Sequence, residues 1–573
     1  MNLQSALVLV LFSVVQLVAN AEKQDPHQAR TMPEFNVAAK PELLDLDMYS
    51  RIRDEGFKRS HVMEYASALF DDIGPRLTGS PAMARANEWT RAQLAAMGCS
   101  DAHLESWGEF GMSWTQIGAS LEMVKPVPGI FLAQATPWSP STPGTVVADV
   151  IAVPGFKVGS DLTAWKGKLK GKVVLYGKSF GPPDVDPDYV YAMEHYDQAK
   201  LKDLSQYSLN DASSGDKAEV FRKAFSDKAF QEKAAKFFAE EGAVAVLEPG
   251  GSSGVLWDDT NSSLGWYVYR PERRQAIPEE VIANEAWDRM TRLLDHKVPV
   301  SVRINIATQF GDEHTQGYNT IAEIPGTDPR LKDEVVMVGG HLDSWIAGTG
   351  ATDNGAGAIA AMEAMRILNR LHVQPRRTIR IALWSGEEQG MFGSIGYVSR
   401  HYASFSYSGA KEDADLPMFL RSLTVAPTLK PEAAKFDAYF NMDNGTGKLL
   451  GIYTEGNEGI AAIFSQWMKP VEDLKMTTIT ERSTDSTDHV PFQQAGLPGF
   501  QFIQDPRDYD SRIHHSNLDT YDHLSEPDLK QAAVIEAIFL YNSAMRDEML
   551  PRPKLPFAGA DKPLEGLYPD AAK

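Results

Sequence analysis

The feature that most constrains the fold is an alternation of apolar strands, polar loops and helices from about residue 316 onward. The segments YNTIAEIPG, EVVMVGG, RTIRIALWS and FDAYFNM have the length and composition of buried strands, and GAGAIAAMEAMRILNRL has those of a helix. Apolar strands that are buried on both faces and alternate with helices are typical of largely parallel α/β sheets. The sequence therefore predicts an α/β fold with a mostly parallel, mixed sheet flanked by helices.

Three of these predicted strands run directly into acidic or imidazole side chains. EVVMVGG is followed by His341 and Asp343, RTIRIALWSG by Glu387 and Glu388, and FDAYFNM by Asp443. Function gathers at the carboxyl ends of the strands in such sheets, so we expect these side chains to share one site. Each residue alone has a simpler explanation as a loop residue, a solvated helix start or a turn. Their coincidence at three strand ends favours a metal site.

Two loops add further residues of the metal-ligand type. The glycine-rich loop HLDSWIAGTGATDNGAGA contains Asp353, and SRIHHSNLDTYDHL contains His514 and His515 beside Asp519. Imidazole and carboxylate ligands without cysteine are typical of a catalytic zinc site that keeps one position open for water. A pair of ions about 3.5–4 Å apart needs a bridging carboxylate. Asp353, held in its glycine-rich loop, can present both oxygens.

The adjacent glutamates predict a division of roles. One of Glu387 and Glu388 can bind metal, while the other stays free as a general base toward water. Asp343 follows His341 by two residues, which places it to accept a hydrogen bond from the imidazole and fix its tautomer.

These motifs resemble those of a known family. GGHLDSW, GATDNGAG, WSGEEQGMFGS, FNMDNGTG, STDHVPFQQAGLPGF and IHHSNLDT are together similar to the zinc exopeptidase family of bacterial aminopeptidases and glutamate carboxypeptidases. PRLTGSP at 75–81 resembles the family's N-terminal helix signal. The resemblance implies the zinc-exopeptidase fold and two Zn²⁺ ions. The metal ligands that it implies are His341, Asp353, Glu388, Asp443 and His515.

The resemblance also implies individual roles. Asp353 bridges the two ions, one ion being completed by His341 and Asp443 and the other by Glu388 and His515. Glu387 becomes the general base. A non-proline cis peptide bond is expected after the bridging aspartate, between residues 353 and 354.

His514 marks a departure from the family pattern. Some relatives carry tyrosine immediately before the last histidine ligand, where it helps to stabilise the tetrahedral intermediate. We expect His514 either to take that role as a hydrogen-bond donor or only to pack against its neighbours.

Changes in composition along the chain predict how it divides into domains. An apolar stretch followed by Ala19-Asn20-Ala21 predicts a signal peptide over 1–21, and with it export to the periplasm or the medium. Residues 22–125 are expected to form the N-terminal part of a catalytic domain and 301–555 its remainder, with a tail over 556–573. The β-rich segment 126–300 is expected to be an inserted domain, and it resembles a protease-associated domain.

One helix has clear boundaries in the sequence. Ser80 is a plausible N-cap, Pro81 fits the first helical position, and Gly98 fits the end. The apolar face that we expect for this helix consists of Ala86, Trp89, Ala92 and Ala96.

Composition limits the partners. A net charge of −21 argues against nucleic acid or an anionic membrane surface. After the N-terminal segment, no stretch of sequence is long and apolar enough to cross a bilayer. Cys99 is the only cysteine, so no internal disulfide forms. We expect Cys99 to be a small packed residue without a catalytic role.

The sequence thus predicts a metallopeptidase that hydrolyses a peptide or dipeptide near a free α-amino group. A glutamate-type carboxypeptidase is the alternative within the family, because Arg482, Arg507 and Arg512 could bind a substrate carboxylate. A non-catalytic binding ectodomain and a one-zinc cyclising acyltransferase are alternatives from other classes. The filled ligand positions, together with the pair His341 and Asp343, favour a catalytic site with two metals.

Overall fold

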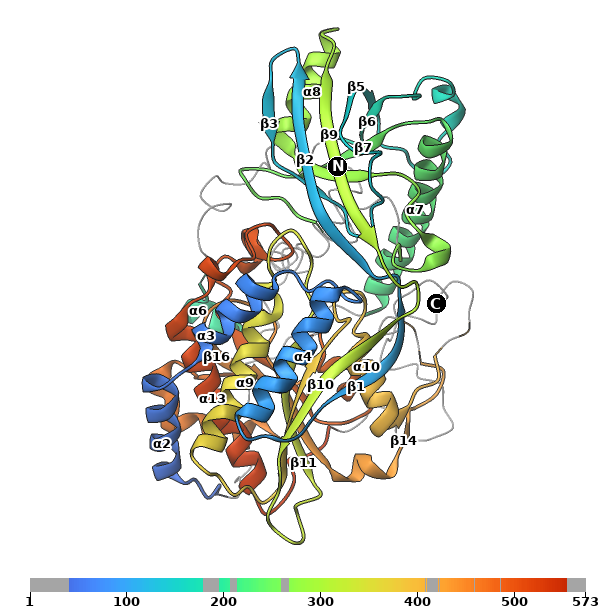
Figure 1. Ribbon diagram of the computed structural model, residues 1–573. Coiled ribbons are helices and arrows are strands. Elements are labelled where there is room, and N and C mark those ends of the chain that lie inside the picture. Colours follow the sequence, from blue (N-terminus) through green and yellow to red (C-terminus); the bar gives the residue numbers. More distant parts are fainter. Residues whose placement is uncertain are drawn as a thin grey trace, which may run out of the picture.

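The computed structural model describes residues 41–178, 195–206, 214–258, 267–407, 409, 421, 423–457, 459–484 and 486–553. These residues form two bodies, each built around its own eight-stranded sheet (Figure 1). The first sheet lies in the lower body of the figure and the second sheet in the upper body. The predicted signal peptide over 1–21 and the predicted tail over 556–573 lie outside the described residues.

The first sheet is mixed, as the sequence predicts. Its strand order is β1, β10, β12, β11, β15, β18, β16 and β17. The central strands β12, β11, β15 and β18 run parallel to one another. The pairs β1–β10, β10–β12 and β16–β18 are antiparallel, and β17 runs parallel to β16. The bounds are β1 Ser100–Gly111, β10 Thr315–Ile324, β11 Val335–His341, β12 Thr378–Trp384, β15 Phe436–Asn441, β16 Leu449–Tyr453, β17 Thr478–Thr480 and β18 Gly499–Gln504.

Helices cover both faces of the first sheet. Val336 and Val338 of β11 pack against one helical layer, and Met337 between them packs against the other. The first layer contains α2 Leu46–Lys58, α3 Val62–Ala66, α4 Pro81–Ala96, α9 Ala356–Arg370, α11 Ala461–Met468 and α13 Glu526–Met545. The second contains α10 Phe392–His401 and α12 Val490–Gln494. The buried strands are therefore apolar on both faces, as their sequences predict.

The boundaries of α4 are as predicted, but its buried face agrees with the prediction only at Ala86 and, in part, at Trp89. The Ser80 side chain accepts a hydrogen bond from the backbone N–H of Met83 at 3.1 Å, which caps the helix. Ala92 and Ala96 are exposed. The buried residues are Met83, Ala86, Asn87, Thr90 and Leu94. Thr90 Oγ1 lies 3.0 Å from Thr320 Oγ1 on β10, so a hydrogen bond from a distant strand lets a polar side chain occupy the buried face.

The second sheet has the strand order β3, β2, β9, β5, β6, β7, β8 and β4. Its strands are β2 Trp114–Lys125, β3 Gly129–Phe131, β4 Ala133–Ala135, β5 Val146–Val153, β6 Val173–Tyr176, β7 Ala245–Gly251, β8 Glu279–Ala283 and β9 Ser301–Phe310. The expected segment 126–300 leaves out β2 and β9, which pair with each other inside this sheet. Only residues 112 and 113 separate β1 from β2, so no loop in the sequence marks where the chain passes between the bodies. The resemblance of this body to a protease-associated domain stays a prediction.

Among the α-helices described between β2 and β9, two pack against the second sheet and one lies against the first body (Figure 1). Their bounds are α6 Gln198–Leu204, α7 Ser214–Glu240 and α8 Asn284–Asp295. Leu201 and Leu204 of α6 pack against Leu450 and Ile503, which belong to β16 and β18. The insertion therefore contacts the first sheet directly.

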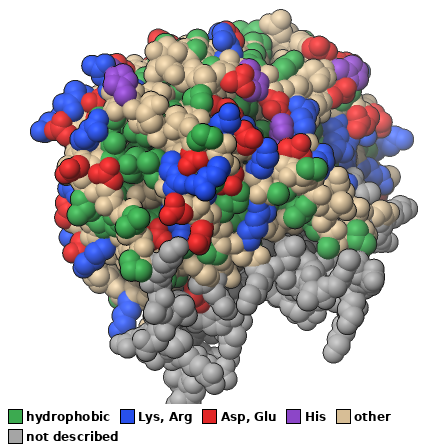
Figure 2. Space-filling model, turned by 90° about the horizontal axis from the view of Figure 1, so that it is seen from below, with side chains coloured by type: hydrophobic (Ala, Val, Ile, Leu, Met, Phe, Trp, Pro, Cys, Tyr) green, Lys and Arg blue, Asp and Glu red, His purple; other side chains and the backbone are tan. Residues whose placement is uncertain are grey.

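The structure also bears on the predictions about charge, Cys99 and membrane spans. Acidic and basic side chains are interspersed on the face seen in Figure 2, so the negative charge does not form one patch there. Cys99 is buried, and Asn369 Nδ2 donates to its sulfur at 3.2 Å, as expected for a packed residue. Throughout the described ranges, none of the helices combines the length and apolar character needed to span a bilayer.

Candidate metal centre

The three predicted strand ends meet at one edge of the first sheet. β12, β11 and β15 are neighbours and run parallel, so their carboxyl ends lie side by side. His341 is the last residue of β11, and Asp443 follows the end of β15 by two residues. Glu387 and Glu388 follow the end of β12. The strand ends therefore bring these side chains close together.

Asp353 stands at the centre of the cluster. It lies in the short helical turn η4, Ala351–Gly355, and the peptide bond that joins it to Asn354 is cis, as the resemblance implies. Its Oδ1 is 3.2 Å from His341 Nε2, and its Oδ2 is 3.2 Å from His515 Nε2. The two oxygens of this carboxylate thus face two different imidazoles.

Each imidazole has a second carboxylate beside it. His341 Nε2 is 3.5 Å from Asp443 Oδ1, and His515 Nε2 is 3.1 Å from Glu388 Oε2. Two groups of nitrogen and oxygen atoms therefore share Asp353, one on each side. The remaining glutamate, Glu387, has its Oε2 3.9 Å from His341 Nε2 and lies at the edge of the first group.

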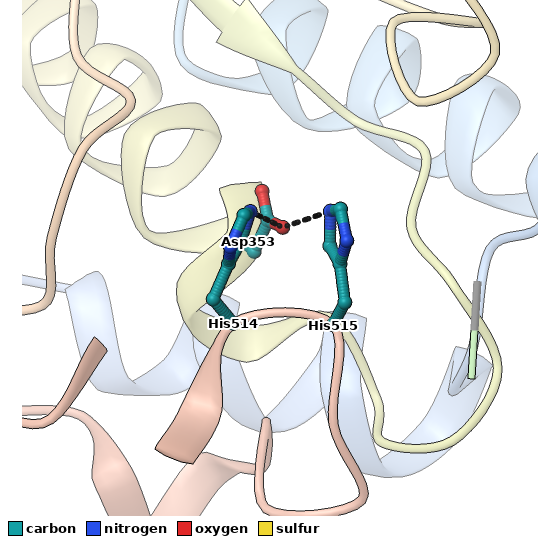
Figure 3. A group of neighbouring side chains, drawn as sticks. All are labelled: Asp353, His514 and His515. Carbon is teal, nitrogen blue, oxygen red and sulfur yellow. Dashed lines mark ion pairs between the residues drawn. The ribbon is translucent and has the colours of Figure 1, made fainter. Parts of the chain in front are cut away.

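His514 also approaches the central carboxylate. Its Nε2 is 3.3 Å from Asp353 Oδ2, the same oxygen that His515 faces (Figure 3). The two histidine rings lie next to each other, with centroids 3.8 Å apart, and His514 also stacks on Tyr509, with centroids 4.7 Å apart. The side chain of His514 is 27% exposed and that of His515 is 17% exposed, so His514 has the freer access to solvent.

These residues fit a pair of zinc-type ions. Glu388 Oε1 is buried and has no hydrogen-bond partner among the described residues. An anionic oxygen buried without a donor is costly unless a cation faces it. The donor set of imidazole nitrogens and carboxylate oxygens suits Zn²⁺.

The electrostatics of the cluster point the same way. Burial raises the pKa of Glu387 well above its usual value, and burial together with the neighbouring charge of Asp353 raises the pKa of Glu388 to about 8. Burial alone lowers the pKa of His341, but the carboxylates of Asp443 and Asp353 outweigh this and raise it well above the usual value. The site concentrates negative charge that a bound cation would neutralise.

Asp343 differs in detail from the expectation. His341 Nδ1 lies 3.1 Å from the backbone carbonyl oxygen of Asp343 and 3.7 Å from its carboxylate. The carboxylate instead accepts hydrogen bonds from the backbone N–H groups of Glu387 and Glu388, both at 3.3 Å, and from Thr78 Oγ1 at 2.9 Å. The carbonyl is placed to fix the imidazole tautomer, and the carboxylate positions the two glutamates.

Asp519 positions the central loop, a role that the sequence did not predict. The Asp519 carboxylate accepts hydrogen bonds from the backbone N–H of Thr352 at 2.6 Å, from the Thr352 hydroxyl at 2.7 Å and from the backbone N–H of Asp353 at 3.2 Å. The sequence shows that Asp519 belongs to the motif IHHSNLDT, but it does not show that Asp519 accepts hydrogen bonds from Thr352 and Asp353.

Arg76 holds the same loop from the other side. Its guanidinium is buried and donates to the carbonyl oxygens of Leu342, Thr349 and Gly350 at 2.6–2.7 Å. The motif PRLTGSP contains Arg76, and this was the only signal for it in the sequence.

Comparison with known proteins shows that part of the chain matches the model of a known family. Peptidase family M28 matches residues 319–539, which include every residue proposed as a ligand. Over these residues the chain is similar to this family. The prediction of a metallopeptidase related to aminopeptidases and glutamate carboxypeptidases is thereby confirmed.

Similarity to individual members extends beyond the matched segment. Carboxypeptidase Q from Mus musculus is 25% identical over 516 residues, which cover 89% of this chain and 90% of that protein. The crystal structure of a peptidase M28 precursor from Shewanella amazonensis superposes with a TM-score of 0.60 at 22% identity, over 89% of this chain and 99% of that chain. A zinc aminopeptidase from Bacillus subtilis has a TM-score of 0.50 at 18% identity, over 86% and 96%. The predicted fold is confirmed by these structures.

Proposed function

We propose that this chain is a di-zinc exopeptidase of the aminopeptidase or dipeptidase type, which hydrolyses terminal peptide bonds. The observation that carries the proposal is the position of Asp353, whose two carboxylate oxygens each lie 3.2 Å from a different imidazole. This is the arrangement that a carboxylate bridging two ions requires. The similar zinc aminopeptidase from Bacillus subtilis supports zinc as the metal.

The ligands divide into two sets around the bridge. His341 and Asp443 would hold one ion together with Asp353, and His515 and Glu388 would hold the other. Bound zinc lowers the pKa of a coordinated water and polarises a carbonyl group.

Glu387 is the proposed general base. Its carboxylate lies beside the first set, is largely buried, and accepts no hydrogen bond from the described residues, so it is available to a water. It takes one proton as the water oxygen attacks the scissile carbonyl carbon. When the C–N bond breaks, the same carboxyl returns that proton to the leaving amine. Burial raises the pKa of Glu387, so its carboxylate is a stronger base for the first transfer.

His514 is the proposed donor to the substrate oxygen. Its partial exposure leaves the ring accessible from solvent, while the stack on Tyr509 limits its movement. A positioned N–H near the carbonyl would stabilise the negative charge that develops there.

The arginines bear on the choice between aminopeptidase and carboxypeptidase. Arg482 donates to Asp203 and to the carbonyl of Gln206, and Arg512 pairs with Asp508 at 3.0 Å, so both are already engaged. This favours recognition of a free α-amino group.

A carboxypeptidase is the second candidate, and Arg507 is the observation in its favour. Arg507 Nη1 is buried and has no hydrogen-bond partner among the described residues, three positions after the end of β18. A substrate carboxylate would provide a partner for it. The similarity to carboxypeptidase Q is in keeping with this alternative.

We further propose that the protein is exported, on the N-terminal sequence pattern, and that the second body is a protease-associated domain. Export is tested by the N-terminal sequence of the mature protein, which should begin after Ala21 if the signal peptide is removed.

Metal counting and a substrate panel test the function. The purified protein should hold two zinc ions per chain, and chelation should abolish hydrolysis, which zinc should restore. Aminoacyl amides and dipeptides should be cleaved, whereas the same substrates with a blocked amino group should not. One tightly bound ion in active protein would favour the cyclising acyltransferase, and no hydrolysis by protein with two ions would favour the binding ectodomain. Cleavage of amino-blocked but not carboxyl-blocked substrates would establish the carboxypeptidase.

A further inference from the structure

A short segment of the inserted body lies directly on the loop that carries His515. Trp257 and Ser516 form an isolated antiparallel bridge between the two bodies. The backbone N–H of Asp258 donates to the carbonyl oxygen of His515 at 3.1 Å. The backbone of a proposed metal ligand is therefore hydrogen-bonded to the insertion.

Asn517 supplies three more hydrogen bonds across the same contact. Its backbone N–H donates to the carbonyl of Leu256 at 3.0 Å, and its Oδ1 accepts from the N–H of Leu256 at 2.6 Å. Its Nδ2 donates to the carbonyl of Gly254 at 3.0 Å. One side chain thus satisfies two backbone groups of the insertion, two positions after His515.

The backbone conformation of His515 requires contacts that stabilise it. His515 has a φ of 57°, in the left-handed region that residues with a Cβ seldom adopt. Such a conformation persists only where surrounding contacts hold it. The hydrogen bonds from 254–258 reach the carbonyl oxygen of His515 itself and Asn517, two positions later.

Aromatic packing ties the same histidine to the insertion through a second route. Trp345 meets the His515 ring edge-on at 6.0 Å and meets Trp138 at 6.5 Å. Trp138 in turn packs with Tyr269 of the inserted body. Both the backbone and the ring of His515 are therefore supported by contacts that involve the insertion.

We propose that Asn517 is a positioning residue that joins segment 254–258 to the His515 loop, so that the inserted body holds one ligand of the metal centre in place. The inference rests on the proposed function, because it takes His515 as a ligand. In this arrangement the insertion is a part of the catalytic unit, and its detachment from the loop would weaken the site that His515 and Glu388 form.

The test compares three variants of the full chain. Asn517→Ala removes both side-chain hydrogen bonds. Asn517→Asp keeps an acceptor for Leu256 N–H and loses the donor to Gly254. Asn305→Ala is the matched control, because Asn305 lies on β9 within the inserted sheet and its side chain accepts a hydrogen bond from Thr145 of the same body at 3.3 Å.

Two readouts are independent of turnover. Competition with a chelator measures the affinity for each zinc ion, and hydrogen exchange measures protection of the Leu256 and Asp258 amides. For Asn517→Ala we expect one zinc ion to bind about 10–100-fold more weakly, the typical effect of removing a group that orients a ligand. The other ion should bind as in the parent, and the two amides should exchange faster. Asn517→Asp should fall between Asn517→Ala and the parent, and Asn305→Ala should match the parent.

The outcomes separate this inference from the proposed function. A parent protein that binds no zinc, or a single ion, would refute the proposed function. A parent with two ions and an Asn517→Ala variant that keeps both affinities while its amides exchange faster would refute the positioning role. Unchanged exchange of the Leu256 and Asp258 amides in Asn517→Ala would refute the proposed connection between Asn517 and segment 254–258. If Asn517→Ala does not fold, parent-like affinity for both ions in Asn517→Asp, with faster exchange, refutes the role equally.

Discussion

Substituting the two adjacent glutamates separately should produce two different failures. Glu387→Gln keeps the shape of the side chain but cannot accept a proton from water. Glu388→Gln keeps the shape but removes the negative charge of the oxygen that lies 3.1 Å from His515 Nε2. If Glu387 is the base and Glu388 a ligand, the first variant should lose turnover with its metal in place, and the second should lose metal.

The structure sets the size of each effect. His341 Nε2 lies 3.9 Å from Glu387 Oε2, which is beyond hydrogen-bonding distance, so the fold loses little in Glu387→Gln. Loss of a general base lowers kcat by about 10²–10⁴-fold, which corresponds to about 3–5 kcal/mol in the barrier. Glu388→Gln should weaken the binding of one zinc ion by at least the roughly 10–100-fold that removal of an outer partner causes.

The assay measures kcat on an unblocked dipeptide, zinc per chain and the urea midpoint for both variants. Glu88→Gln is the control, because Glu88 is an exposed glutamate of α4 whose ion pair with Arg91 contributes little. Excess zinc should partly restore Glu388→Gln and should not restore Glu387→Gln. If Glu387→Gln loses metal while Glu388→Gln retains it, the two roles are reversed. If both variants stay as active as the control, the glutamates are only a solvated helix start and the reasoning fails.

Three further predictions follow from other parts of the structure. Cys99→Ser should leave kcat and zinc content unchanged, because burial raises the pKa of the Cys99 thiol to about 12 and no thiolate forms near neutral pH; lost turnover in folded variant would contradict this. Burial raises the pKa of Glu280 from 4.5 to about 8, so between these values the folded chain keeps a proton that the unfolded chain releases, and stability falls as pH rises. Glu280→Gln should therefore be more stable than the parent at pH 9, by up to about 4–5 kcal/mol in the free energy of unfolding, and the difference should be much smaller at pH 5. Urea denaturation with chelator present measures both differences. Equal differences at the two pH values would refute the role of Glu280. Arg507→Met should leave kcat/KM for aminoacyl amides unchanged, and a loss confined to substrates with a free carboxylate would establish the carboxypeptidase alternative.

The sequence by itself was sufficient to gather the central residues of the site. His341, Glu387, Glu388 and Asp443 follow three apolar strands, and parallel neighbours in an α/β sheet bring their carboxyl ends to one edge. The chemistry of imidazole and carboxylate ligands then pointed to zinc. Such inferences succeed because strand direction and ligand type are properties of short segments.

The tertiary structure decided which way individual side chains turn and what holds them. The Asp343 carboxylate accepts hydrogen bonds from the backbone of Glu387 and Glu388, while its carbonyl oxygen lies beside His341. The spacing of two residues between His341 and Asp343 does not determine which of these oxygens faces the imidazole. The polar Thr90 lies on the buried face of α4 because Thr320, 230 positions later, provides its partner. Hydrogen bonds between distant segments lower the cost of burying polar groups, and sequence periodicity does not encode them.

The relation between the two bodies was also beyond the sequence. Segment 254–258 gives no sign of its destination, yet its backbone pairs with the loop of His515, more than 250 positions away. Backbone N–H and carbonyl groups are the same in every residue, so a contact made largely through them leaves only Asn517 as a trace in the sequence. The amino acids of the motifs determined what the site can bind, and the docking of the insertion determined how one of its ligands is held.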